Sequence, residues 1–426
     1  MKINSMDIKN YRNFSALHVD FDPRLTVFVG ANGSGKTTIL DALAIFLEMI
    51  ADSYLRYPDS VISLKNVRIQ RDKIDEIMLD SQISYKFYYK NNDNNFLNYT
   101  VYHHQLRIQE LDNINTINNI IKNNIKPVVV NYGSKRIVNN YQRESSAHSE
   151  YEYAFKNAFN AGIDFSSTLT WFIEKSAEEA MQGRKKRDLD YTIPELDAAR
   201  KAVSKALGDY NEPYADGTPP QLFITHTATP DIPLNIQQLS DGYRTMLALV
   251  MDLARRMALA AQKYKNEIKN ALDYPAIVLI DEVELHLHPA WQQRVLPSLL
   301  EIFPNTQFIV TTHSPQIISS IEPKHLRILS QNRVSLPSSS TYGAESQRVL
   351  EEVFGVTARY SENEAKKTLD AYFELIHKGE YESEQAKEYR SKLDEWLNGD
   401  PALDSADMLI RRAQRIRERG TGNVEA

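Results

Sequence analysis

The sequence predicts an α/β fold: a parallel sheet with helices on its faces, an inserted β-rich and helical lobe, and a helical C-terminal region. Two observations carry this prediction. The apolar run 25–30 passes through a glycine-rich loop into a helix-patterned segment, and the apolar run 277–280 ends in two acidic residues. Continuous apolar strands of this kind are typical of buried parallel sheets, which bind ligands at the carboxyl ends of their strands.

Length and composition indicate an ordinary globular protein. The chain has 426 residues, 42% of them hydrophobic, a formal net charge of -6 and no cysteine. This length allows one large domain with an insertion, or two to three smaller units. The lack of cysteine excludes disulfides and thiolate chemistry. Because no signal peptide and no apolar run of roughly 18 residues is apparent, we expect a cytoplasmic protein.

The glycine-rich loop is the first chemical motif. "GANGSGKTT", residues 30–38, matches G-x-x-x-x-G-K-[ST] between a strand and a helix. Glycines there let backbone N–H groups turn toward phosphate oxygens, and the helix N-terminus adds partial positive charge. We expect Lys36 to bridge the terminal phosphates and Thr37 to bind magnesium. The predicted nucleotide-binding residues of the loop are Asn32, Gly33, Ser34, Gly35, Lys36, Thr37 and Thr38.

The second motif lies at the end of the run 277–280. Asp281 is expected to hold magnesium through water, and Glu282 to activate or position the water that attacks the terminal phosphate. The alternative is an acidic strand end that only caps a helix. A further strand, 306–314, ends near His313, whose imidazole is expected to hydrogen-bond the terminal phosphate.

The third motif, "LSDGYRTM" at 239–246, opens a helix-patterned run. Ser240 stands where this helix needs a cap. The residue three positions on is Tyr243 rather than Glu or Gln, so the sequence has no capping box, and Asp241 and Gly242 leave backbone donors that could meet an anion. The local pattern therefore leaves both interpretations open, a helix cap and an anion site.

"LSDGY" resembles the LSGGQ signature of ABC-type ATPases, and the order of the motifs reproduces that of the superfamily. The resemblance implies an ABC-type P-loop ATPase head that uses ATP and Mg²⁺. It also implies an ATP-sandwich dimer, in which Ser240, Asp241 and Gly242 of one copy close over the phosphate held by the other. "IKNYRNF", "DEVELHLHP" and "THSPQII" are similar to the branch containing SMC, RecF and overcoming-lysogeny proteins. There Arg12 matches an arginine that reaches the nucleotide phosphates.

A closer resemblance is to the Septu (PtuA) and retron-associated ATPases of antiphage defence. It is carried by "LSDGYRTMLALVMDLA", "DEVELHLHPAWQ", "VVVNYGSKR" and "YGAESQRVLEEVFG". The resemblance implies an ATPase that controls a separate HNH nuclease, PtuB. Overcoming-lysogeny nucleases carry a metal-binding Toprim domain after the ATPase motifs. We expect no DNA cleavage by this chain alone, because the sequence after His313 leaves too little room for such a domain. Two alternatives stay open: a RecF-like ATP-dependent DNA clamp in repair, and a nucleotide sensor with negligible hydrolysis.

The predicted organisation has three parts. Residues 1–51 and 221–335 form the ATPase core, and 52–220 form the inserted lobe, within which 128–136 is expected to be a core strand. Residues 336–426 are the first candidate for docking a nuclease or another copy. The inserted lobe has a basic loop that is either a solvated surface or a contact for DNA, RNA or an acidic partner, namely Arg184, Lys185, Lys186 and Arg187.

Overall fold

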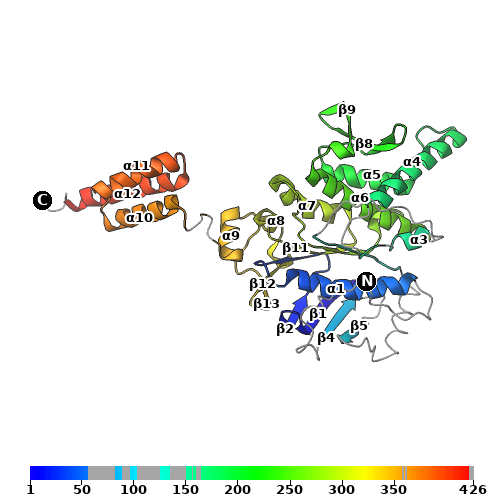
Figure 1. Ribbon diagram of the computed structural model, residues 1–426, viewed down its shortest axis with the longest axis horizontal. Helices are drawn as coiled ribbons and strands as arrows, with labels where there is room; N and C mark the ends of the chain where they lie inside the picture. The colour runs from blue at the N-terminus through cyan, green and yellow to red at the C-terminus, as the bar shows by residue number, and fades with distance from the viewer. Residues whose placement is uncertain are drawn as a thin grey trace. The chain divides into compact units, whose positions relative to one another are not determined.

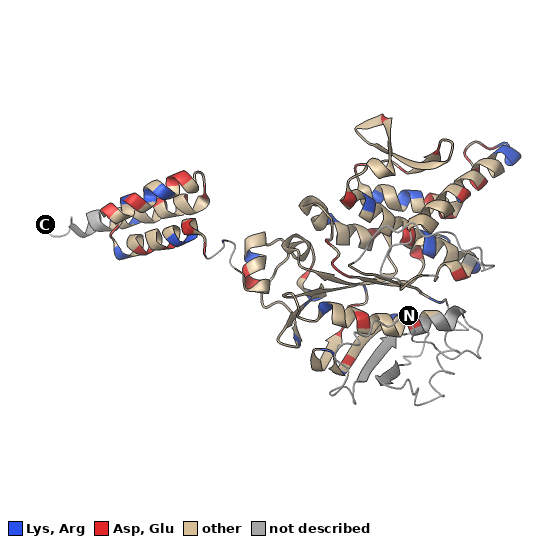
Figure 2. Ribbon diagram, viewed as in Figure 1, with Lys and Arg blue, Asp and Glu red and all other residues tan. Residues whose placement is uncertain are grey.

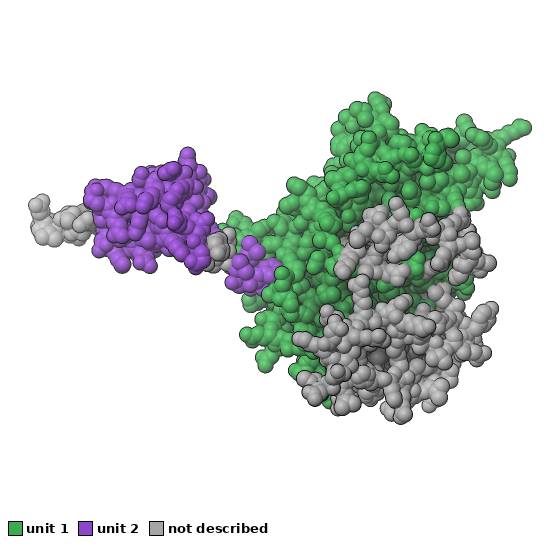
Figure 3. All heavy atoms as spheres, viewed as in Figure 1, with its two compact units in different colours: residues 1–349 green, residues 350–426 purple. Residues whose placement is uncertain are grey.

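The computed structural model describes residues 1–55, 82–88, 96–102, 125–134, 150–155, 157–159, 165–356, 359 and 362–421. The chain divides into two compact units, Met1–Val349 and Leu350–Ala426 (Figure 3). Much of the predicted inserted lobe lies outside the described residues. The three-part division therefore stays a prediction. None of the described helices combines the length and apolarity needed to cross a membrane.

A six-stranded sheet organises the first unit, in the order β13-β12-β3-β11-β10-β6 (Figure 1). The five strands after β13 in this order are mutually parallel, and β13 pairs antiparallel at one edge. Every residue of β3, β10 and β11 is buried, which explains the continuous apolar sequence of β10 and the largely apolar centres of β3 and β11. The predicted α/β class is confirmed. The strands are β3 (Leu25–Val29), β6 (Val128–Tyr132), β10 (Ala276–Ile280), β11 (Thr306–Thr312), β12 (Leu326–Ser330) and β13 (Arg333–Ser335).

Helices cover both faces of this sheet (Figure 1). Helix α1 (Lys36–Leu55) lies on one face, and α6 (Asp241–Ala261) lies on the other. Helix α6 is the centre of its layer, because all its residues from Thr245 to Ala261 are buried. The other helices of the unit are α3 (Glu150–Tyr153), α4 (Phe165–Lys186), α5 (Pro194–Leu207), α7 (Pro289–Ile302), α8 (Pro315–Ser319) and α9 (Ser346–Phe354), the last of which runs into the second unit.

Two smaller antiparallel sheets complete the unit. The first has the order β2-β1-β4-β5 and the second β7-β8-β9. Their strands are β1 (Lys2–Tyr11), β2 (Phe14–Asp20), β4 (Gln82–Tyr88), β5 (Phe96–Tyr102), β7 (Tyr214–Asp216), β8 (Gln221–His226) and β9 (Thr229–Asn235).

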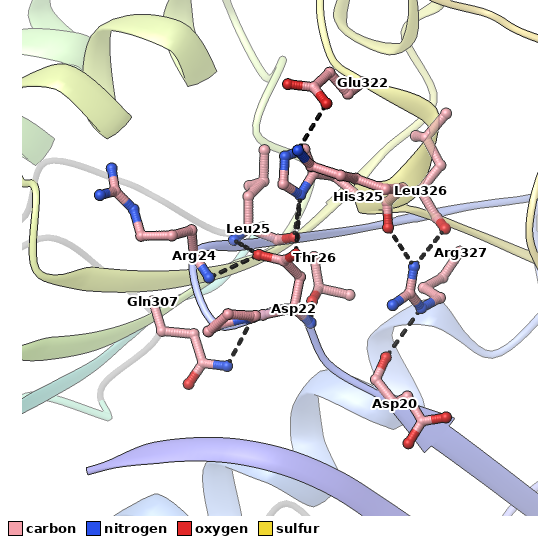
Figure 4. A network of polar contacts seen from close by, with 12 residues as sticks. Asp20, Asp22, Arg24, Leu25, Thr26, Gln307, Glu322, His325, Leu326 and Arg327 are labelled. Carbon is pink, nitrogen blue, oxygen red and sulfur yellow. Dashed lines mark hydrogen bonds and ion pairs between the residues drawn. The ribbon is translucent and has the colours of Figure 1, made fainter. Parts of the chain in front are cut away.

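A polar network ties β1 and β2 to the central sheet at the amino end of β3 (Figure 4). The side chain of Gln307, fully buried on β11, donates to the carbonyls of Ile3 and Asp22 at 2.8 and 3.0 Å. The Asp22 carboxylate accepts the N–H groups of Arg24 and Leu25 at 2.8 and 3.1 Å. These bonds fix where β3 begins, at the end opposite the glycine-rich loop.

The second unit contains three helices, α10 (Glu364–Lys378), α11 (Glu384–Trp396) and α12 (Pro401–Thr421). They share a hydrophobic core of their own, which includes Leu369, Tyr372, Ile376, Leu393 and Leu403. Asn363 and Ser383 cap the first two helices with side-chain hydrogen bonds. The helical character predicted for the C-terminal region is present.

Candidate functional site

The glycine-rich loop lies between β3 and α1, at the carboxyl edge of the central sheet (Figure 1). Gly33 and Gly35 have φ angles of +79° and +101°, which L side chains rarely adopt. A Cβ at Gly35 would also come within 2.3 Å of Cζ of Phe14, whereas a Cβ at Gly33 would meet nothing within 4 Å. The loop therefore needs Gly33 for its backbone and Gly35 for both backbone and space.

Lys36 lies inside this loop. Its ammonium donates to the carbonyl oxygens of Gly30 and Ala31 at 2.9 and 3.0 Å, and its side chain is almost fully buried. Burial lowers the pKa of Lys36, and nearby carboxylates, that of Asp281 above all, oppose this shift. Among the other predicted loop residues, Asn32, Gly33 and Thr37 are exposed, Ser34 and Gly35 are half-buried, and Thr38 is buried.

Thr37 and Asp281 meet across the edge of the sheet. The hydroxyl of Thr37 lies 3.2 and 3.4 Å from the two carboxylate oxygens of Asp281. Hydroxyl and carboxylate oxygens are ligands that Mg²⁺ accepts, usually beside substrate phosphates and water. The described residues contain no cluster of three or more His, Asp or Glu side chains suited to a metal. These two oxygen donors fit a magnesium ion whose remaining ligands would come from the nucleotide phosphates and water.

Thr311, on β11, orients the acidic pair. Its hydroxyl donates to Oδ1 of Asp281 at 2.6 Å and accepts the backbone N–H of Glu282 at 2.7 Å. The backbone N–H of Asp281 donates to the carbonyl of Tyr132 on β6 at 2.8 Å. Glu282 is half-buried and has a φ of +48°, so its backbone leaves the strand direction directly after Asp281.

Glu284 is a site residue that the sequence reasoning missed. Its Oε1 accepts the backbone N–H of His313 at 2.6 Å. Its other oxygen, Oε2, is buried and finds no hydrogen-bond partner in the part of the chain that the structure describes. Burial and the neighbouring Lys36 lower the pKa of His313, which favours its neutral imidazole. A third acid two residues after Glu282 was the signal available in the sequence.

Ser240 occupies the N-cap position of α6, but its side chain makes no capping hydrogen bond. The residue is exposed, and within the described chain no hydrogen bond or ion pair joins Ser240, Asp241 or Gly242 to the loop 30–38. A Cβ at Gly242 would come within 2.6 Å of the carbonyl oxygen of His286. The segment after β10 therefore packs directly against the start of α6.

An aromatic cluster supports this start of α6. The Tyr243 ring packs edge-on against Trp291 and Tyr210, with ring centroids 4.8 and 5.1 Å apart. Aromatic pairs at these separations add to the stability of the packing beyond their buried area. The cluster anchors Tyr243 in the first turn of α6, whereas Ser240 is exposed.

Arg12 lies in the turn between β1 and β2 with a φ of +51°. Its Nη1 forms an ion pair with Oδ2 of Asp41 on α1 at 2.7 Å, and both side chains are about one-third exposed. The neighbouring Asn13 side chain lies 3.5 Å from the carbonyl of Ser34. The turn thus lies beside the glycine-rich loop, and contact of Arg12 with a nucleotide stays a prediction.

The basic run is not the loop that the sequence analysis expected. Arg184, Lys185 and Lys186 form the last turn of α4, and Figure 2 shows these basic residues at the far end of that helix. Basic side chains are favoured in the last turn of a helix because they complement the negative end of the helix dipole, so a run of basic residues can continue a helix instead of forming a loop. Arg187 follows the helix, and all four residues are exposed.

Comparisons with known proteins show two matching sequence families. One is described as "AAA domain, putative AbiEii toxin, Type IV TA system" and matches residues 122–319, and the other, "AAA ATPase domain", matches residues 1–170. The "Retron Ec83 probable ATPase" of Escherichia coli is 28% identical and aligns with 94% of this chain and 84% of the relative. The "Septu protein PtuA" of Bacillus mycoides is 24% identical over 92% of this chain, which spans 50% of that relative.

Among solved structures, an SMC head bound to the C-terminal winged-helix domain of ScpA aligns with 80% of this chain and 98% of its own, at 15% identity and a TM-score of 0.48. The sequence matches confirm the predicted resemblance to retron-associated and Septu ATPases, because they extend over nearly the whole chain.

Proposed function

We propose that this chain, a relative of the retron ATPases and Septu PtuA over most of its length, binds and hydrolyses ATP as a subunit of a bacterial antiphage defence complex. One observation carries the proposal. Lys36 and Thr37 at the start of α1 and Asp281 directly after β10 meet at the carboxyl edge of the sheet, with the Thr37 hydroxyl 3.2 Å from the Asp281 carboxylate. Parallel sheets of this kind bind nucleotides at that edge.

The residues at this edge of the sheet have different roles in ATP hydrolysis. The backbone N–H groups of 33–36 and the Lys36 ammonium hold the phosphates, and Thr37 and Asp281 provide oxygens for Mg²⁺. When bound, Mg²⁺ neutralises the charge of the terminal phosphates. Glu282 positions the attacking water and accepts its proton, while His313 donates a hydrogen bond to the terminal phosphate. The products are ADP and phosphate.

The active site is completed by a second copy of the chain. Ser240, Asp241 and Gly242 at the start of α6 close over the phosphate held by the partner. This assignment is supported by Ser240, which is exposed and whose side chain forms no capping bond, and by the absence of a hydrogen bond or ion pair from the described residues 240–242 to the loop of the same chain. A helix N-terminus with free backbone donors attracts anions.

The Glu282→Gln variant tests this function against its alternatives. We expect it to bind ATP as the wild type does, to lose about 100-fold or more of its turnover, and to accumulate an ATP-dependent dimer or larger homo-oligomer in size-exclusion chromatography. Equal and negligible turnover in both proteins would indicate a nucleotide sensor. ATP-dependent binding to DNA without an associated nuclease would indicate the RecF-like clamp.

An HNH nuclease similar to PtuB is the proposed partner, controlled by ATP-dependent dimerisation of this chain. The second unit is the proposed docking part, because its helices form a core of their own and leave Trp396 and Met408 43% and 62% exposed. Truncation after Phe354 removes α10, α11 and α12 and should abolish co-purification with the proposed HNH partner. Unchanged co-purification would place the contact in the first unit.

The end of α4 is the proposed nucleic-acid contact. Four exposed basic residues there could bind phosphates without reading sequence. Reversing Arg184 and Lys185 to Glu should weaken binding to duplex DNA or RNA and flatten its salt dependence. The matched control reverses Lys387 and Lys392, two exposed lysines of α11. Equal loss in both pairs would indicate only a change of net charge.

A further inference from the structure

Helix α6 carries a buried ionic cluster that the proposed chemistry does not use. Asp252 is fully buried, and Arg255 and Arg256 are 4% and 1% exposed. Nη2 of Arg255 and Nε of Arg256 donate to the Asp252 carboxylate at 2.9 and 2.7 Å. Nearly every other buried side chain of this helix is apolar. A cluster that packing alone does not require stands 11 residues after Asp241, about 16 Å along the helix from its first residue.

Tyr132 connects this cluster to the acidic pair of the site. Its hydroxyl donates to Oδ2 of Asp252 at 2.8 Å. Its carbonyl accepts the backbone N–H of Asp281 at 2.8 Å. Tyr132 pairs with Ile280 in the parallel register of β6 and β10, directly before Asp281. Tyr132 thus contacts Asp281, directly after β10, through its backbone and α6 through its side chain.

The protonation states keep this connection intact at neutral pH. Burial raises the pKa of Asp252, but Arg256 and Arg255 outweigh burial and hold the pKa at about 2. Burial and the neighbouring Asp252 raise the pKa of Tyr132 well above its ordinary value, so its hydroxyl stays a donor. The Asp252 carboxylate therefore accepts four hydrogen bonds, the fourth from Thr168 of α4 at 3.1 Å.

Such a buried ionic cluster is not well explained by a contribution to the stability of the fold. Removing charges from water costs several kcal/mol per ion, and apolar side chains of similar volume often serve as well or better. What an ionic cluster adds is a fixed relative position of the elements that it joins. Here the cluster joins β6 and α4 to α6. In addition, Nη1 of Arg256 donates to the carbonyl of Ala154 at 3.0 Å.

We propose that Tyr132 and Asp252 are positioning residues that couple the strand bearing Asp281 to the helix bearing Ser240. A displacement of Asp281 on nucleotide and metal binding moves Tyr132 through its backbone hydrogen bond, and Tyr132 moves α6 through Asp252. The rigid helix carries this movement to Ser240, the group that meets the second copy. The inference rests on the proposed ATP-dependent dimerisation and adds a route by which one chain reports its bound nucleotide at its dimer surface.

The Tyr132→Phe substitution tests this coupling, because it removes one hydroxyl and keeps the buried ring. Two variants match it. Tyr274→Phe removes another buried hydroxyl, which donates to the Lys126 carbonyl at 2.8 Å at the opposite end of β10. Thr168→Val removes a different hydrogen bond to the same Asp252 carboxylate. Each substitution removes a hydroxyl that donates a hydrogen bond, and only Tyr132→Phe breaks the link between α6 and β6.

The assay uses the full chain with Glu282→Gln, so that assembly is not reversed by hydrolysis. We expect Tyr132→Phe to raise the ATP concentration for half-maximal assembly about 5-fold or more, which is a typical coupling between sites. Both control variants should shift it less than 2-fold. The Kd for ATP, measured with Ser240→Arg added to block assembly, should be the same in all variants. Equal shifts in all three variants, or a changed Kd in Tyr132→Phe alone, would overturn the coupling.

Hydrogen exchange gives a second measurement that needs no substitution at Tyr132. In the Glu282→Gln protein carrying Ser240→Arg, ATP should slow exchange in β6 and α6 together with the loop 30–38. Slowed exchange in the loop with no change in α6 would contradict the route. A Glu282→Gln protein that binds ATP and never assembles would overturn the proposed dimerisation as well, whereas normal assembly with no effect of Tyr132→Phe would overturn the coupling alone.

Discussion

Substitution of Ser240 separates its two interpretations, a helix cap and a residue that acts on another copy. A capping serine contributes about 1 kcal/mol through its side-chain hydrogen bond to the first turn. The Ser240 side chain makes no such bond, and the residue is exposed. Ser240→Ala should therefore change the free energy of unfolding by less than about 0.5 kcal/mol, as exposed substitutions away from specific contacts do. Ser383→Ala is the matched control, because the Ser383 side chain caps α11 by accepting the N–H of Ala386 at 3.2 Å, and it should cost about 1 kcal/mol.

Urea titration followed by circular dichroism measures both free energies, each from the transition of the unit that carries the substitution. Ser240→Arg completes the experiment, since its side chain has room in solvent but would occupy the dimer surface. It should keep the Kd for ATP and lose assembly in the Glu282→Gln background. A cost of 1 kcal/mol or more for Ser240→Ala, together with normal assembly of Ser240→Arg, would refute the reasoning and leave a simple cap.

Three further predictions concern the phosphate site. Lys36→Ala should abolish ATP binding in calorimetry and leave the far-ultraviolet circular dichroism unchanged; retained binding would mean that the loop is not the phosphate site. Glu284→Gln should keep the acceptor for the N–H of His313 and retain more turnover than Glu284→Ala, which loses it; equal turnover would remove Glu284 from the site. Gly33→Ala should destabilise the fold by about 1 kcal/mol from its positive φ, and Gly35→Ala by clearly more because its Cβ would lie 2.3 Å from a ring carbon, as thermal melting would show.

The sequence alone was sufficient for the parallel sheet and for the loop that leads into α1. Both depend on short-range patterns: a buried strand needs an unbroken apolar run, and a phosphate-binding turn needs glycines at fixed spacing from a lysine. The same reasoning placed Asp281 and Glu282 at the end of a strand. It also predicted that a helix starts near Ser240, which the structure bears out, since α6 begins at Asp241.

Tertiary structure decided which groups contact one another. Tyr132 and Asp252 are 120 positions apart in the chain, and Thr311 is 30 positions from the Asp281 carboxylate that it contacts. The helical spacing of Asp252 from Arg255 and Arg256 permits their ion pairs. Nothing local indicates that Tyr132 and Thr168 also bond Asp252, because hydrogen bonds depend on distance and direction in space. The missing capping bond at Ser240 likewise could not be read from residue type, because serine commonly caps helices. Local sequence patterns determine where elements and loops form, whereas long-range packing determines which polar groups the folded chain brings within hydrogen-bonding distance.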